Sequence, residues 1–183
     1  MIFKTYKQND ILNNTQLIDF IVNTICDNLE YLFGSNMRSN QNKNEWIEYN
    51  LKTVNPDWYC VIASNENILY GLLIFTYDKS NKRITINDIE IPKAYRHNIT
   101  LIRGLFREAL LRNDFRFIRG YINKNNYESQ NNFLKYTTII NETRNGYVIE
   151  TQEQNNERIL RILKRELWWI KYLKIYLIKN QKK

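Results

Sequence analysis

Two segments of this 183-residue chain hold most of its excess positive charge, and basic side chains are the ones that bind anions. Residues 92–124 carry eight Lys and Arg against two Asp and Glu, and residues 151–183 carry nine against three. The rest of the chain is slightly acidic, although the net charge is +8. Each basic segment can face phosphate, nucleic acid or a membrane surface, and a solvated basic face is the alternative for both.

Metal and disulfide chemistry have little support in the sequence. Cys26 and Cys60 form no CxxC pair, and the chain has one histidine, so we expect no metal site and two buried, reduced thiols. The start of the chain turns polar at once, and no run of 18 uncharged apolar residues follows. We therefore expect no transmembrane segment and a cytoplasmic protein.

Hydrophobic periodicity predicts the elements that must position the polar side chains. Alternating patterns predict strands at 3–7, 57–63, 68–77, 84–91, 115–122, 138–141 and 147–150. Helical spacing predicts helices at 14–32, 46–54, 99–112 and 125–136. This mixed order, without repeats or a linker, implies an α+β or α/β sheet with helices on its faces, and we expect the α+β class.

The element order and the segment from Ile84 to Gly146 resemble the GNAT family, the Gcn5-related N-acyltransferases. In that family, a loop after the fourth strand carries a valine, a proline and an R-G-x-G-x-G/A pattern. The loop opens a helix whose backbone amides hold the pyrophosphate of acetyl-CoA. Ile91 stands at the valine position and Arg96 at the arginine position. The resemblance implies acetyl-CoA as the cofactor, bound by Ile91, Arg96, His97 and Asn98.

The glycines of the family pattern are absent from this loop. His97, Ile99 and Leu101 stand where the family has glycine or another small residue. Each adds a side chain where the pyrophosphate should touch backbone. We therefore predict an eroded cofactor site, with phosphate held by the charge of the basic segment as the alternative.

A second family motif follows the fifth strand, with an Asn that positions the cofactor arm and a Tyr that serves as general acid. Residues 126–129, Asn-Tyr-Glu-Ser, match its opening, so the resemblance implies a cofactor contact for Asn126. Phe133 stands at the tyrosine position and has no proton to give. Tyr136, three residues later, is the candidate replacement if the helix is shifted or rotated.

An enzyme of this family also needs a base for the incoming amine. Strand side chains alternate, so Asp88 and Glu90 share one face, and Glu90 is nearer the loop. Glu90 is therefore the candidate base, against the alternative of a solvent-facing carboxylate. His97 is a weaker candidate because it lies in the phosphate loop rather than in the acceptor groove.

The family fold would end near Glu150, so we divide the chain into a GNAT-like domain at 1–150 and an addition at 151–183. Apolar spacing in the addition predicts one long, basic, amphipathic helix. Its exposed aromatic residues are the expected partner-binding residues: Trp168, Trp169, Tyr172 and Tyr176. The first interpretation is a protein partner or a homo-oligomer. The alternatives are a membrane surface, nucleic acid, or a helix that packs only within its own chain.

The first functional hypothesis is a catalytically eroded member of the fold that works as a structural or assembly component. Phages with A+T-rich genomes carry proteins of this fold in or near their virions, so a virion location is expected if a phage encodes the chain. The alternative is an active acetyl-CoA-dependent N-acetyltransferase. A weaker alternative is a nucleic-acid-associated protein that uses both basic segments.

Overall fold

The computed structural model describes residues 1–33, 45, 58–111, 113–152, 155–159 and 161. The helix expected near 46–54 and nearly all of the expected C-terminal helix lie outside these residues. The same is true of the expected partner-binding residues Trp168, Trp169, Tyr172 and Tyr176. The described residues therefore belong almost entirely to the 1–150 part of the chain, with the first residues of the addition.

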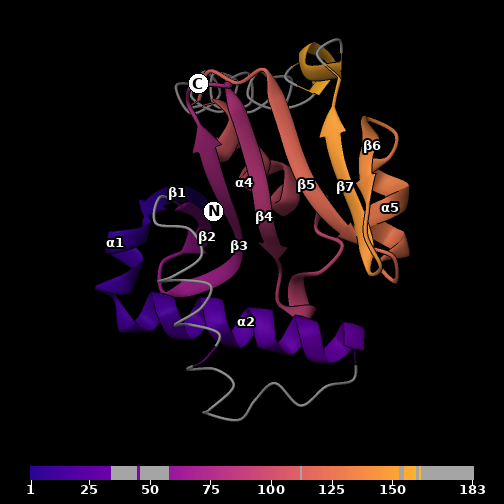
Figure 1. The fold of residues 1–183 in the computed structure, drawn as a ribbon. Coiled ribbons are helices and arrows are strands. Elements are labelled where there is room, and N and C mark those ends of the chain that lie inside the picture. The colour runs from indigo at the N-terminus through magenta and orange to yellow at the C-terminus, as the bar shows by residue number, and fades with distance from the viewer. Residues whose placement is uncertain (34–44, 46–57, 112, 153–154, 160, 162–183) are drawn as a thin grey trace, which may run out of the picture.

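A seven-stranded mixed sheet forms the centre of the molecule (Figure 1), with the strand order β1-β2-β3-β4-β5-β7-β6. Its strands are β1 (Ile2–Lys7), β2 (Trp58–Asn65), β3 (Ile68–Asp78), β4 (Arg83–Glu90), β5 (Phe117–Asn123), β6 (Thr137–Glu142) and β7 (Gly146–Thr151). Strands β4 and β5 are parallel, and every other neighbouring pair is antiparallel. The expected mixed sheet flanked by helices is confirmed.

Helices cover both faces of this sheet. α1 (Gln8–Leu12) and α2 (Thr15–Phe33) pack on one face, and α4 (Ile99–Leu111) packs on the other, behind the sheet in Figure 1. α5 (Tyr127–Phe133) meets α4 through the rings of Phe106 and Phe133, whose centroids are 5.8 Å apart. The short α1 was not expected, because five residues are too few to show a helical period.

Apolar stripes at helical spacing attach these helices to the sheet. Leu17, Ile21 and Ile25 of α2 are buried against Trp58, Cys60 and other residues of β2 and β3. Leu101, Leu105 and Ala109 of α4 are fully buried on the opposite face. Each large apolar side chain buried in this way contributes about 1.5–3 kcal/mol to stability. The two layers fix α2 and α4 on either side of β4.

One extra residue in β4 decides which face its carboxyl groups occupy. The register with β3 skips Asn87, which is therefore a β-bulge. The isoleucines that face the α4 side are Ile84 and Ile86 before the bulge, and Ile89 and Ile91 after it. Because the bulge changes the parity of the strand, Asp88 and Glu90 turn toward α2 instead of entering the core under α4.

The two parallel strands pair over only part of their length. Residues 83–86 of β4 pair with residues 117–120 of β5, and the ladder stops where the bulge begins. Beyond that point β4 continues to Glu90 and β5 to Asn123 without pairing to each other. The two strands diverge toward the end of the sheet nearest α2 (Figure 1). This separation opens the sheet beside Glu90.

Candidate functional site

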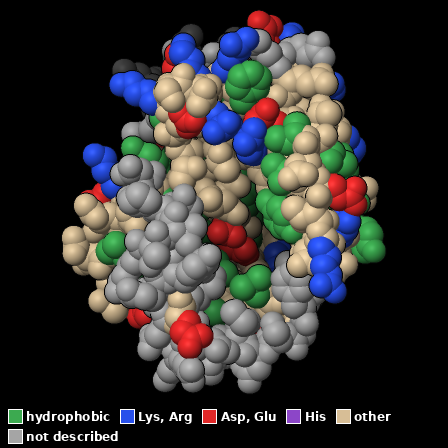
Figure 2. All heavy atoms as spheres, in the orientation of Figure 1, with side chains coloured by type: hydrophobic (Ala, Val, Ile, Leu, Met, Phe, Trp, Pro, Cys, Tyr) green, Lys and Arg blue, Asp and Glu red, His purple; other side chains and the backbone are tan. Residues whose placement is uncertain are grey.

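The candidate site lies where β4 and β5 separate, between the C-terminal end of β4 and α2. Figure 2 shows acidic side chains recessed in a hollow on this face of the molecule. Burial raises the pKa of Asp88 to about 7. Burial, with a smaller contribution from Asp88, raises the pKa of Glu90 to about 8, against the opposing effects of Asn28 and Arg96. Both carboxyl groups can therefore exchange a proton near neutral pH.

A buried asparagine of α2 connects Glu90 to the loop that follows β4. The Asn28 Nδ2 atom donates hydrogen bonds to Oε2 of Glu90 and to the carbonyl oxygen of Ile91, the latter at 3.4 Å. The guanidinium of Arg96 donates to Oδ1 of the same amide. Sequence reasoning missed Asn28, although a signal existed. It lies seven residues after Ile21 and three after Ile25, on the stripe that α2 buries.

The loop between β4 and α4 leads directly into the N-terminus of α4. A single 3-10 turn, Lys93–Tyr95, follows Pro92, and Arg96 and His97 then lead to Asn98. The Asn98 side chain caps α4, because its Oδ1 accepts a hydrogen bond from the N–H of Leu101 at 3.1 Å. The N–H groups of the first two residues of α4 precede any intrahelical partner, and they carry the positive end of the helix dipole.

The three residues that replace family glycines behave differently from one another. His97 has φ 68°, the left-handed conformation that glycine adopts most readily. The Leu101 side chain is fully buried in the core and points away from the loop surface. The Ile99 side chain is 54% exposed at the start of α4. Leu101 therefore places no side chain on the surface where an anion would bind.

Two other expected cofactor-binding residues have structural roles. Ile91 is buried in the core on the α4 side, so only its backbone is available to a ligand. Asn126 caps α5, because its Oδ1 accepts a hydrogen bond from the N–H of Ser129 at 3.0 Å. These contacts account for both residues without a ligand, and their cofactor contacts stay predictions.

Tyr136 does not lie beside Glu90. α5 ends at Phe133, and Tyr136 precedes β6, where its ring lies 5.4 Å from the guanidinium of Arg158. The neighbouring Thr137 pairs with Thr151, a residue that also bonds the start of β5. Tyr136 is therefore at the opposite end of the sheet from the opening. The helix expected at 125–136 ends at Phe133, so Tyr136 does not lie on it.

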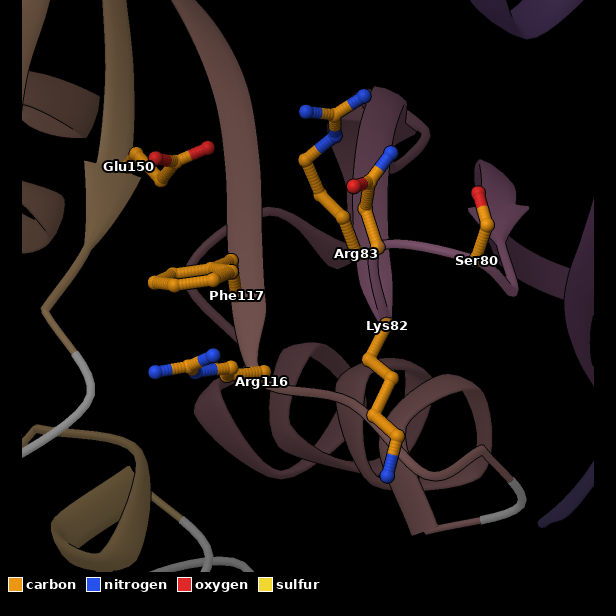
Figure 3. Close-up of a pocket in the computed structure, with 7 residues that line it drawn as sticks. Ser80, Lys82, Arg83, Arg116, Phe117 and Glu150 are labelled. Carbon is orange, nitrogen blue, oxygen red and sulfur yellow. The ribbon is translucent and has the colours of Figure 1, made fainter.

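A second hollow lies at that opposite end of β4 and β5. It is lined by Ser80, Asn81, Lys82, Arg83, Arg116, Phe117 and Glu150. Two of its cations already have acidic partners, Lys82 with Asp114 at 2.6 Å and Arg83 with Asp78 at 3.2 Å. Figure 3 shows the Lys82, Arg83 and Arg116 side chains pointing in three different directions. These charges do not converge on one ligand, so the opening beside Glu90 is the better candidate.

Within the described ranges, no cluster of His, Cys, Asp and Glu has the arrangement of a metal site. Of the helices in that part of the chain, none is long and apolar enough to cross a membrane.

Comparison with known proteins gives a similarity of fold. No family model matches the chain, and no curated protein matches it in sequence. Among solved structures, it is similar to the PaiA N-acetyltransferase of Thermoplasma acidophilum in complex with coenzyme A, with 12% identity, a TM-score of 0.58 and coverage of 83% of this chain and 99% of that one. The chain is also similar to Tetrahymena GCN5, with 11% identity, a TM-score of 0.59 and coverage of 82% of this chain and 95% of that one.

A third similar structure is apo FdhC, described as a nucleotide-linked sugar GNAT. It is 12% identical, with a TM-score of 0.61 and coverage of 89% of this chain and 92% of that one. At such identities the likeness concerns the fold alone. The chain therefore has the fold of the GNAT N-acyltransferases.

Proposed function

We propose that this chain is an acyl-CoA-dependent N-acyltransferase, in which the loop 91–101 holds the cofactor phosphates and Glu90 accepts a proton from the amine. The observation that carries the proposal is the opening between β4 and β5. It places a proton-accepting carboxyl group and the N-terminus of α4 at the same end of one strand. The sequence alone favoured a non-catalytic role and kept the acyltransferase as the alternative. With the opening beside Glu90, the acyltransferase becomes the first candidate.

The residues present fit a cofactor that carries a pyrophosphate. The backbone N–H groups of Ile99 and Thr100 at the start of α4 would donate hydrogen bonds to the phosphate oxygens, and Lys93 and Arg96 would add positive charge. The left-handed backbone at His97 lies two residues before the start of α4. When bound, acetyl-CoA supplies the acyl group as an activated thioester.

Glu90 supplies the proton chemistry in this proposal. A general base works best when its pKa lies near the working pH, and the pKa of Glu90 is about 8. The carboxylate is the form that accepts a proton, so the rate should rise with pH through about 8 and then level off. Asn28 holds the carboxyl group in place from α2.

A second candidate is a protein of this fold that does not transfer the acyl group, as a structural or assembly component. One observation favours it: Phe133, at the position of the family's general acid, packs against Phe106 and offers no proton. A virion location and partner binding through the C-terminal addition belong to this candidate.

Calorimetry with acetyl-CoA separates the two candidates. The acyltransferase should bind acetyl-CoA in the micromolar range, and Arg96→Ala should weaken binding at least tenfold. Lys135→Ala is the matched control, because it removes an exposed cation at the other end of the sheet. Thiol release from acetyl-CoA with a panel of primary amines then tests transfer. Absence of heat up to millimolar acetyl-CoA would eliminate the enzyme, whereas binding without thiol release would favour the second candidate.

A further inference from the structure

Asn28 joins three segments that are far apart in the sequence. It lies on α2, it donates to Glu90 at the end of β4, and it accepts from Arg96 in the phosphate loop. The Asn28 side chain is buried, with 8% of the residue exposed, and its second donor contact to the Ile91 carbonyl ties it to the strand end. The amide is therefore held by both of its ends.

The chemistry of the three groups fixes the direction of each hydrogen bond. A guanidinium only donates, an ionised carboxylate only accepts, and an amide does both. Oδ1 of Asn28 must therefore face Arg96 while Nδ2 faces Glu90. A change at Arg96 alters how firmly the amide is oriented, and the orientation of the amide determines how well it solvates the Glu90 carboxylate.

We propose that Asn28 is a positioning residue that links the phosphate loop to Glu90, so that an anion held at Arg96 strengthens the hold of Glu90 on its proton. The anion offsets the positive charge that favours ionised Glu90, and it competes with Asn28 for the guanidinium donors. A carboxylate that holds a proton more strongly is also a stronger base. The consequence for catalysis rests on the proposed function, whereas the link between the three side chains does not.

Among the described residues, few other charged groups surround Glu90. Asp88 lies on its own strand, and Arg96 approaches from the loop. The side chains opposite on β3 are Leu72 and Ile74, both apolar, and β5 makes no ladder with this part of β4. On α2, Asp27 and Glu30 flank Asn28. Asp88, Asp27 and Glu30 are unchanged in the Arg96 and Asn28 variants below, so their contributions cancel in the comparison.

A double-mutant cycle read by carboxyl carbon NMR tests the link. In protein labelled with carbon-13 glutamate, the resonance that Glu90→Gln removes belongs to Glu90, and its titration midpoint should lie near pH 8. Arg96→Met should raise this midpoint by about one pH unit in the wild-type background. In the Asn28→Ala background, the same Arg96→Met change should raise it by less than half as much.

The controls separate a specific link from loosened packing. Thr24→Val removes a buried hydroxyl one turn earlier on α2, where it bonds only within its own helix, and should leave the full shift in place. If Asn28→Ala does not fold, Asn28→Ser replaces it, because a serine hydroxyl is polar but too short to span both partners. Equal shifts in the two backgrounds, or no shift in the wild type, would overturn the proposal.

Addition of CoA provides a second arm of the experiment. CoA should raise the Glu90 midpoint in the wild type, and the rise should be at least halved in Asn28→Ala. If CoA raises the midpoint equally in both proteins, the link does not pass through Asn28. If calorimetry detects no CoA binding, the proposed function fails, and the double-mutant cycle still decides the link between Arg96, Asn28 and Glu90.

Discussion

Asp88 and Glu90 are two carboxyl groups that the fold keeps partly out of water, two residues apart on one face of β4. Ionising either of them costs free energy because burial leaves the charge poorly solvated, and for Glu90 the nearby Asp88 adds to this cost. The unfolded chain has no such cost. The stability of the protein must therefore depend on pH through these two residues.

The sign of that dependence follows from proton binding. The pKa values rise from 3.8 to about 7 for Asp88 and from 4.5 to about 8 for Glu90, so between pH 4 and 8 the folded protein binds more protons than the unfolded chain. The free energy of unfolding should therefore fall by several kcal/mol as pH rises through this window. Urea unfolding measured from pH 5 to pH 9 should show that the free energy of unfolding depends less on pH in the double variant Asp88→Asn, Glu90→Gln than in the wild type.

Asp78 is a control for the same experiment, because its contribution to stability changes only in more acidic solution. Hydrogen bonds from Asn81 and Ser80 hold the pKa of its carboxyl group below its usual range. Its contribution to stability is present above the ordinary pKa and is lost in acid, so Asp78→Asn should lower stability at pH 7 without changing the slope between pH 5 and 8. If the free energy of unfolding of the double variant at 88 and 90 falls with rising pH as steeply as that of the wild type, the two carboxyl groups are not the cause of the pH dependence.

Ile99 is the replaced glycine position whose apolar side chain lies exposed at the start of α4. We expect Ile99→Ala to tighten acetyl-CoA binding several-fold, because it removes a β-branched side chain beside the first amides of the helix. Calorimetry measures this change. Leu101→Ala is the contrasting variant: it should destabilise the fold by about 2–5 kcal/mol, because its side chain is fully buried. Unchanged affinity in Ile99→Ala would show that this side chain does not obstruct the loop.

At the scale of elements, α4 approaches β1 so closely that one position requires glycine. A Cβ atom added to Gly104 would lie 2.0 Å from the Phe3 ring. Gly104→Ala should therefore destabilise the protein by about 1–3 kcal/mol, although alanine is the better helix former. Urea unfolding measures the loss, and Phe3→Leu in the same chain should recover part of it.

Gly120→Ala is the matched control for Gly104. Its nearest neighbour to an added Cβ atom is 3.8 Å away, which is ordinary contact. This variant should stay within about 0.5 kcal/mol of the wild type, as substitutions outside packed contacts do. An equal loss at both glycines would mean that backbone conformation, rather than the Phe3 ring, determines the effect at position 104.

Periodicity predicted these elements well wherever packing follows the local pattern. The stripes of α2 and α4 and the apolar runs of β2 and β3 are visible in the sequence, and the structure confirms them. The bulge at Asn87 was not predictable, because one unpaired residue leaves no periodic trace, yet it sets the face of Glu90. The length of α5 was overestimated because the Asn126 cap and the contact of Thr137 with the Phe133 carbonyl are local hydrogen bonds.

At the scale of the whole molecule, the first basic segment does not form one surface. Among its described residues, Lys93 and Arg96 belong to the loop before α4. Arg107 lies on α4, and its guanidinium is 5.9 Å from the centre of the Phe3 ring of β1. Arg119 and Lys124, on β5 and just after it, pair with Glu150 and Glu142 of β7 and β6. Nucleic-acid binding by this segment would need a continuous basic face, so we expect the C-terminal addition to carry any such contact.

The start of that addition packs on the GNAT-like domain. Asn156 is buried and donates to the carbonyl oxygen of Arg116, and Asn155 donates to that of Tyr136 at 3.2 Å. Arg158 lies over the Tyr136 ring, and Ile159 joins the core on the α4 side. These contacts place residues 155–159 within the folded unit and make residue 162 a suitable point for truncation.

Truncation tests the proposed partner-binding role of the addition. Removal of residues 162–183 deletes Trp168, Trp169, Tyr172 and Tyr176 but keeps every contact just described, so the melting temperature should stay close to that of the full chain. Removal of residues 155–183 also exposes apolar core and should lower it. If the addition joins copies of the chain, the shorter truncation should reduce the mass in solution, as light scattering measures. An unchanged mass at every concentration would leave a different protein as the partner, and a large loss of stability on removing 162–183 would show that these residues serve the domain itself.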